Sequence, residues 1–195
     1  NYAWILHMLS KMDESNGIAG FLLANGALNA GAGVDDEGSE NSEYLIRKQL
    51  LERDKVEAII VLPRDMFYTT DISVTLWILN NNKKPHELNG RMLRDRTNEV
   101  LFVDLRRWDD NTEEYVLDKN KKKKKTVLSR KQIEKIRDLY FAWQSADRSL
   151  YEDVPEYCKA VTLEDEDGIR ANNYTLTPSK YIEFIDHDLD IDFPK

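Results

Sequence analysis

The spacing of apolar and polar residues over the first third of the chain predicts two helices that alternate with two strands. Apolar positions in 2–12 fall mostly on one face of a helix, and a second helix is expected from Ser42 to about residue 53. Residues 18–24 and 56–62 are nearly continuous apolar runs, which is typical of strands buried on both faces of a sheet. Because short connections join these elements, the pattern favours a parallel α/β sheet.

Two more strands are predicted downstream. Residues 72–79 form an apolar run that no helix separates from 56–62. These two strands are therefore expected to be antiparallel neighbours, joined by the loop 64–71. A fourth strand, 99–105, is expected at the edge of the sheet.

The last third of the chain carries one clear helix signal. Ser129 and Gln132 suit a capping box, which would begin a helix ending near Gln144. One stripe of this helix would carry the apolar side chains Ile133, Ile136, Tyr140 and Trp143. Residues 145–195 hold 13 acidic and 5 basic residues and are interrupted by prolines, so short irregular elements are expected there.

Composition narrows the class of protein. With 41% hydrophobic residues the chain can form a core, and with 33% charged residues it has no apolar run near the ~20 residues that span a bilayer. We expect no membrane partner. The single cysteine, Cys158, excludes an internal disulfide and favours a reducing, cytoplasmic location. Because Asn1 leads directly into an amphipathic helix, a fragment cut within a domain is expected.

Charge and histidine spacing exclude two further classes. Residues 1–144 are neutral overall, so the chain lacks the basic body of a free-standing nucleic-acid binder. No metal site is expected, because metal-ligand spacing is absent among the three histidines, His7, His86 and His187.

Two segments are candidates for chemistry. The polar loop after residue 62 carries Phe67 and Tyr68 side by side; either an aromatic ring projects to stack on a ligand base, or Phe67 closes the core below the loop. A lysine run could contact DNA phosphate or be a solvated loop without a specific role; it comprises Lys121, Lys122, Lys123, Lys124 and Lys125.

A series of short blocks in fixed order resembles a known family. The series includes Ala3-Trp4-Ile5-Leu6-His7-Met8, Gly20-Phe21-Leu22-Leu23-Ala24-Asn25-Gly26, Ile46-Arg47-Lys48-Gln49-Leu50-Leu51, Val61-Leu62-Pro63, Phe67-Tyr68-Thr69-Thr70-Asp71-Ile72, Leu76-Trp77-Ile78-Leu79-Asn80, Val103-Asp104-Leu105-Arg106, Tyr140-Phe141-Ala142-Trp143 and Leu176-Thr177-Pro178-Ser179-Lys180-Tyr181. It is similar to the C-terminal part of the modification subunit of type I restriction–modification systems, an adenine-N6 DNA methyltransferase. The likeness covers nearly the whole chain.

The resemblance implies a fold and a division of the chain. The fold would be α/β: the later half of a Rossmann-like methyltransferase sheet, mixed, with an antiparallel strand pair, followed by a helical, acidic C-terminal extension. Residues 1–108 would be the C-terminal half of the catalytic domain, 109–128 a lysine-rich linker and 129–195 the extension. The strands would be the fifth, then the sixth and seventh as the antiparallel pair, then an extra strand.

The resemblance also implies a site and its cofactor. The family binds S-adenosylmethionine through a glycine motif and holds the target adenine with an Asn-Pro-Pro-aromatic tetrapeptide. Neither motif occurs in these 195 residues, so no catalytic residue is expected in this chain and the chain alone would be inactive. The residues that would line the target-base pocket are Phe67, Tyr68, Thr69 and Thr70.

The implied partners are DNA, a specificity subunit and a restriction subunit. A half sheet would also leave an unpaired strand edge at 18–24, which favours self-association. Three alternatives stay open: a non-catalytic interaction module from a truncated or split gene, a partner chain that supplies the missing half, and an unrelated α/β enzyme.

Overall fold

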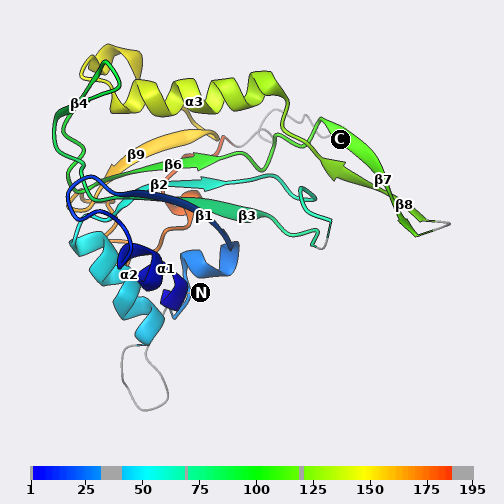
Figure 1. The fold of residues 1–195 in the computed structure, drawn as a ribbon, viewed down its shortest axis with the longest axis horizontal. Helices are drawn as coiled ribbons and strands as arrows, with labels where there is room; N and C mark the ends of the chain where they lie inside the picture. Colours follow the sequence, from blue (N-terminus) through cyan, green and yellow to red (C-terminus); the bar gives the residue numbers. More distant parts are fainter. Residues whose placement is uncertain (1, 32–40, 69, 119–120, 186–195) are drawn as a thin grey trace, which may run out of the picture.

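The computed structural model describes residues 2–31, 41–68, 70–118 and 121–185, and shows a mixed sheet with few helices (Figure 1). The elements in chain order are α1 (Tyr2–Leu9), β1 (Ile18–Ala24), the 3-10 turn η1 (Asn25–Leu28), α2 (Ser42–Glu52), β2 (Val56–Val61), β3 (Val74–Asn80), β4 (His86–Leu88), β5 (Arg91–Leu93), β6 (Glu99–Asp104), β7 (Thr112–Asp118), β8 (Lys121–Thr126), α3 (Arg130–Gln144), η2 (Arg148–Leu150), β9 (Cys158–Thr162) and η3 (Pro178–Lys180).

Five strands form the main sheet in the order β1-β3-β2-β6-β9. β3 is antiparallel to both β1 and β2, which confirms the antiparallel pair predicted for 56–62 and 72–79. β2 and β6 are parallel, and β9 is antiparallel to β6. The strands β1 and β2 run in the same direction but are not neighbours, because β3 lies between them.

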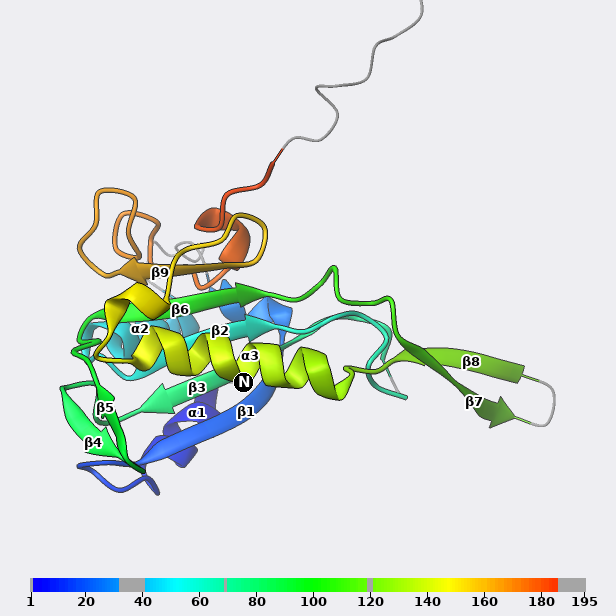
Figure 2. The same ribbon diagram turned by 90° about the horizontal axis from the view of Figure 1, so that it is seen from above.

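Helices cover the two faces of the sheet unequally. α1 and α2 lie on one face and α3 lies on the other (Figures 1 and 2). β2 is buried at every position, as its apolar sequence predicts, because it is central and covered on both faces.

The prediction that residues 18–24 are buried on both faces is wrong. β1 is the edge strand and alternates exposed and half-buried positions. Its inward side chains, Phe21 and Leu23, pack on the α1 and α2 side. The other face, with Ile18 and Leu22, stays exposed because α3 packs over other strands (Figure 2).

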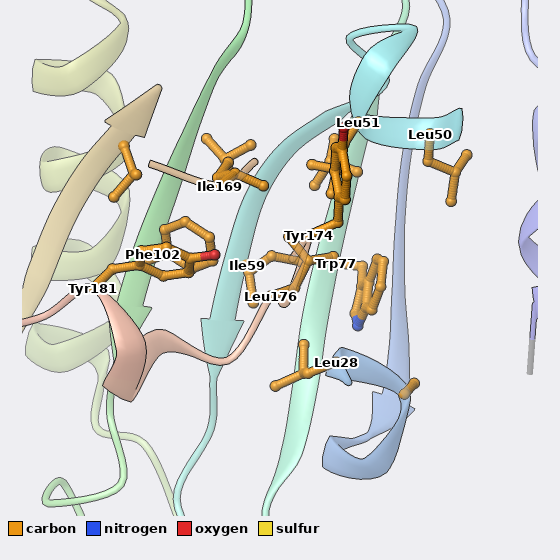
Figure 3. Close-up of a cluster of buried hydrophobic side chains, with 14 of the residues drawn as sticks. Leu28, Leu50, Leu51, Ile59, Trp77, Phe102, Ile169, Tyr174, Leu176 and Tyr181 are labelled. Carbon is orange, nitrogen blue, oxygen red and sulfur yellow. The ribbon is translucent and has the colours of Figure 1, made fainter. Parts of the chain in front are cut away.

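The larger core cluster lies between the sheet and α1, α2 and the C-terminal segment. Trp77 of β3 and Phe102 of β6 form its floor, and Tyr181 stacks on Phe102 with ring centroids 4.5 Å apart (Figure 3). Ile169 and Leu176 also lie in this cluster. The C-terminal segment, which follows the last strand of the sheet in sequence, therefore completes this core.

The helix ends follow their sequence signals closely. In α3 the Ser129 hydroxyl accepts from the Gln132 amide at 3.3 Å, and the Gln132 side chain accepts from the Ser129 amide at 2.8 Å, which confirms the capping box. Trp143 is buried on the expected stripe, but Ile133 is exposed, because the first turns of α3 extend beyond the core. The cap of α2 is Asn41 rather than Ser42.

Three sequence expectations about the C-terminal half need correction. The strand at 99–104 is not at the edge, because β9 pairs with its outer side. The segment 109–128 contains the β7–β8 hairpin rather than only a linker. The extension after 129 is not separate from the sheet, since β9 belongs to it. In the part of the chain that the structure describes, no helix is long and apolar enough to cross a membrane.

Candidate functional site at the carboxyl end of the sheet

The carboxyl ends of β1, β2 and β6 meet at one edge of the sheet. These strands run in the same direction, so the turn at Asn25, the loop 62–73 and the segment after Asp104 all leave from this edge. The β7–β8 hairpin follows β6 and projects beyond the sheet on the same side (Figure 1). Ligands of open α/β sheets bind outside the carboxyl ends of the strands, so this edge is the candidate site.

The loop 62–73 presents one aromatic side chain to solvent. Pro63 follows β2 and cannot donate to a strand ladder, and Asp65 adopts a left-handed conformation with φ 59°. An isolated bridge joins Phe67 to Thr70 and tightens the turn. Tyr68, at the tip, is 57% exposed, whereas Phe67 is half-buried and belongs to neither core cluster.

The two threonines of the predicted pocket do not present a side chain that the structure shows to be exposed. Thr70 is half-buried, and its hydroxyl accepts from the Ile72 amide at 3.3 Å. Thr69 lies outside the described residues. The projecting ring expected in this loop is therefore that of Tyr68.

The lysine run forms strand β8 and packs against this loop. The Lys125 ammonium donates to the Tyr68 hydroxyl at 3.0 Å and lies 4.7 Å from the centroid of the Tyr68 ring. The ring of Tyr115, on β7, meets Tyr68 edge to face at 4.8 Å. Lys123 forms an ion pair with Asp71 at 3.1 Å. The structure thus brings together two candidate segments that lie more than fifty positions apart.

Both inward lysines are held in the charged form. The hydrogen bond to Tyr68 raises the pKa of Lys125, and the hydrogen bond and charge of Asp71 raise the pKa of Lys123. The strand conformation itself follows from cross-strand charge pairing, because acidic residues of β7 face lysines of β8. The side chain of Lys121 is outside the described part of the structure.

A second polar cluster, which the sequence reasoning did not assign to a site, lies at the end of β6. The Asp104 carboxylate is buried and accepts from the Arg106 amide at 3.0 Å and from its guanidinium at 2.5 Å. This carboxylate raises the pKa of Arg106. Arg107 pairs with Glu156 at 2.7 Å, and the cluster lines a hollow of about 250 Å³. The sequence signal that could have identified this cluster is Asp-x-Arg-Arg at the end of a buried strand.

The polar groups at the end of β1 are engaged by hydrogen bonds within the chain. Ala27 and Leu28 are buried, and the Tyr2 hydroxyl donates to the carbonyl of Ala27 at 2.6 Å. The Asn25 side chain already accepts from the Thr75 hydroxyl at 2.6 Å. Residues 32–40, shortly after this turn, lie outside the described residues, and we derive no chemical step through S-adenosylmethionine from the residues at the end of β1.

Two larger hollows lie away from this edge. One, of about 480 Å³, lies between α1 and α2 beside Lys55 and Asn81, at the amino end of β2. The other, of about 580 Å³, lies between β5 and the end of α3 and is lined by Met92, Phe141 and Leu150. Among the described residues, no three His, Cys, Asp or Glu side chains gather to hold a metal ion.

Comparison with known proteins gives consistent matches. The family model described as N-6 DNA Methylase matches residues 1–189. The chain is 34% identical over 182 residues to the Type I restriction enzyme HindI methylase subunit of Haemophilus influenzae, covering 93% of this chain and 33% of that protein. It is 31% identical over 182 residues to the MjaIX methylase subunit of Methanocaldococcus jannaschii, covering 93% of this chain and 27% of that one.

Solved structures agree with these matches. The type I restriction–modification methyltransferase subunit of Streptococcus thermophilus superposes with a TM-score of 0.66 at 26% identity, over 94% of this chain and 30% of that one. A subunit of another type I system superposes with a TM-score of 0.58 at 17% identity and supports the fold. The chain thus spans about a third of the length of the relatives it matches. With the family model matching nearly every residue, the chain belongs to the N-6 DNA Methylase family.

Proposed function

We propose that this chain forms the C-terminal part of the modification subunit of a type I restriction–modification system, which transfers a methyl group from S-adenosylmethionine to N6 of adenine in DNA. The observation that carries the proposal is the family match over residues 1–189, together with relatives named as type I methylase subunits. The sheet supports it, because β2 and β3, which the resemblance takes as the sixth and seventh strands, are an antiparallel pair.

The chain would supply part of the wall of the target-base pocket. Methyltransferases extrude the target base from the duplex, and the extruded base needs a surface on which to stack. The ring of Tyr68 is exposed at the carboxyl edge, beside Phe67 and Thr70. The lone pair of the adenine amine is delocalised into the ring, so methyl transfer depends on positioning and on hydrogen-bond acceptors around the amine.

Methyl transfer would need residues that this chain lacks. Neither the glycine motif that the family carries on its first strand nor a Pro-Pro sequence occurs in the 195 residues. We therefore infer that the chain alone is inactive and that the methyl-donor site belongs to the rest of the subunit. The lysines of β8 would contact DNA phosphate within a complex that includes a specificity subunit and a restriction subunit, in the cytoplasm.

Two measurements test this proposal. Calorimetric titration of the 195-residue chain with S-adenosylmethionine is expected to show no binding, and micromolar binding would contradict the placement of the donor site. The polypeptide of the complete reading frame, assembled with its specificity subunit, is expected to transfer tritiated methyl groups to adenine in duplex DNA. Failure of that transfer would overturn the proposed function.

The free edge of β1 favours one alternative, a non-catalytic interaction module. An unpaired strand edge recruits partners, and Ile18 and Leu22 are exposed beside it. The nucleotide sequence upstream of the codon for Asn1 separates the two functions. A frame that encodes the glycine motif and the Asn-Pro-Pro-aromatic tetrapeptide supports the methyltransferase, and its absence supports the interaction module.

A further inference from the structure

Strand alternation divides the lysines of β8 between two faces of the hairpin. Successive side chains of a strand point to opposite faces, so Lys123 and Lys125 share one face and Lys122 and Lys124 share the other. The contacts agree with this division. Lys123 and Lys125 contact the loop 62–73, although the Lys123 side chain is still 44% exposed, whereas Lys122 pairs with Glu114 of β7 and is 73% exposed.

The inner face attaches the hairpin to the loop at several points. Tyr115 stands directly opposite Lys123 in the ladder and meets the ring of Tyr68 edge to face. Lys125 donates to the Tyr68 hydroxyl and also lies over its ring. At the base of the hairpin, the Thr126 amide donates to the Asp65 carbonyl at 2.8 Å. Aromatic and cation–π contacts of this kind are directional, so several of them acting on one ring together select one position of the Tyr68 ring.

The outer face has the chemistry of a phosphate-binding strip. Lys122 is 73% exposed on its side chain, and its ion pair with Glu114, at 3.4 Å, lies fully at the surface. Lys124 is exposed and directly opposite the same Glu114. Two cations thus share one weakly held carboxylate, and DNA phosphate competes easily with a surface ion pair of this kind.

We propose that the β7–β8 hairpin couples DNA backbone contact to the position of the target-base wall. Lys122 and Lys124 bind phosphates of the duplex, while Lys123, Lys125 and Tyr115 are positioning residues that act through the loop and hold the ring of Tyr68. Docking of phosphate on the outer face therefore fixes where Tyr68 stands relative to the DNA. This inference rests on the proposed function and assigns separate tasks to lysines that the sequence presents as one uniform run.

Two double variants with the same change of charge test the division. Lys122→Gln with Lys124→Gln removes the outer pair, and Lys123→Gln with Lys125→Gln removes the inner pair. Binding of the complete subunit, assembled with its specificity subunit, to a fluorescently labelled DNA duplex is measured by anisotropy over a range of salt concentrations. We expect the outer variant to reduce the salt slope by about 2, so that its affinity falls about tenfold less than that of the unaltered protein between about 50 and 200 mM salt, and the inner variant to reduce the slope by less than half as much.

Amide hydrogen exchange over residues 64–73 gives the second readout. The inner variant is expected to accelerate exchange in this loop several-fold, and the outer variant to leave it unchanged. Tyr115→Ala should accelerate it as the inner variant does, and Tyr115→Phe, which keeps the edge-to-face contact, should not. Exchange in β2 reports whether each variant is folded.

Two results would overturn the proposal: equal loss of salt slope in both double variants, or loop exchange that does not differ between them. Each is distinct from failure of the proposed function. The proposed function fails when the complete polypeptide transfers no methyl group, whereas these results can arise in a subunit that methylates DNA normally.

Discussion

The Arg47 side chain on α2 donates from Nε to the backbone carbonyl of Tyr174, 127 positions later, at 2.8 Å. It also donates to the carbonyl of Ala30 and, at 3.4 Å, to the Tyr2 hydroxyl. Arg47 is fully buried. One guanidinium thus joins the first helix, the turn after β1 and the C-terminal segment on one face of the sheet.

Removal of this guanidinium should destabilise the whole domain. Arg47→Ala leaves two buried carbonyls without a donor, and we expect the free energy of unfolding to fall by about 3 kcal/mol or more. Urea denaturation followed by tryptophan fluorescence measures it. Arg130→Ala, at a solvent-exposed ion pair on α3, is the control and should change the free energy by less than about 0.5 kcal/mol. Equal effects of the two variants would contradict the bridging role of Arg47.

The buried pair of Glu57 and Arg96 predicts non-additive energetics. Arg96 Nε lies 3.3 Å from the Glu57 carboxylate, both side chains are fully buried, and Gln144 donates to the same carboxylate at 2.8 Å. Glu57→Leu leaves an uncompensated buried cation and should cost about 3–5 kcal/mol. The double variant Glu57→Leu with Arg96→Leu should lose clearly less free energy of unfolding than the two single variants added together. A double-mutant cycle measured by urea denaturation gives this difference. Additive losses would show that the two charges are not coupled.

Stability should fall as the pH rises into the alkaline range. Burial raises the pKa of Tyr157 to about 12, and burial also raises the pKa of Cys158, Tyr140 and Tyr151. In the unfolded chain thiols and phenols lose their protons near about 8.5 and 10, so above these values the unfolded state binds fewer protons than the native state. Urea midpoints measured between neutral pH and about pH 10.5 should therefore decrease. A midpoint that stays constant across that interval would contradict the burial of these groups.

The free edge of β1 should cause the isolated chain to self-associate. Among the described residues β1 pairs only with β3, and its exposed Leu22 leaves an apolar edge for a second copy. Sedimentation velocity should show mass that increases with concentration, and Leu22→Lys should reduce it by placing a charge at the edge. Ile72→Lys, in the loop and more exposed than Leu22 (63% against 45%), is the control. A clean monomer at high concentration would refute the prediction.

The ring of Tyr68 should contribute to methyl transfer in the complete subunit. A stacked base is worth about 1–3 kcal/mol, so Tyr68→Ala should lower kcat/KM for DNA by about 10- to 100-fold. Tyr68→Phe keeps the ring and loses only the hydrogen bond from Lys125, and should retain most of the activity. Tritiated methyl transfer measures both variants. Unchanged activity of Tyr68→Ala would remove this residue from the pocket.

Local sequence patterns predicted the elements whose partners lie close along the chain. The capping box of Ser129 and Gln132, the fully buried strand β2 and its antiparallel pairing with β3 follow from the residues directly around them. Ordered blocks of residues also indicated the family, which the match over 1–189 confirms. The site was anticipated in part, because the loop with Tyr68 and the lysine run were both singled out, but not their contact.

The tertiary structure alone decided which segments become neighbours. β9 has a mixed sequence, Cys-Lys-Ala-Val-Thr, which predicts neither a strand nor a loop strongly. It forms a strand because its backbone pairs with the free side of β6. Lys121–Thr126 is a strand only because β7 supplies opposite charges across the hairpin. Pairing between distant segments depends on a partner that local periodicity cannot identify, whereas capping and burial of a central strand depend on residues near at hand. For this reason the sequence by itself determined the family and, in the described part of the chain, the three helices and four of the strands, and the tertiary structure decided the remaining strands, the edges of the sheet and the contact between Tyr68 and Lys125.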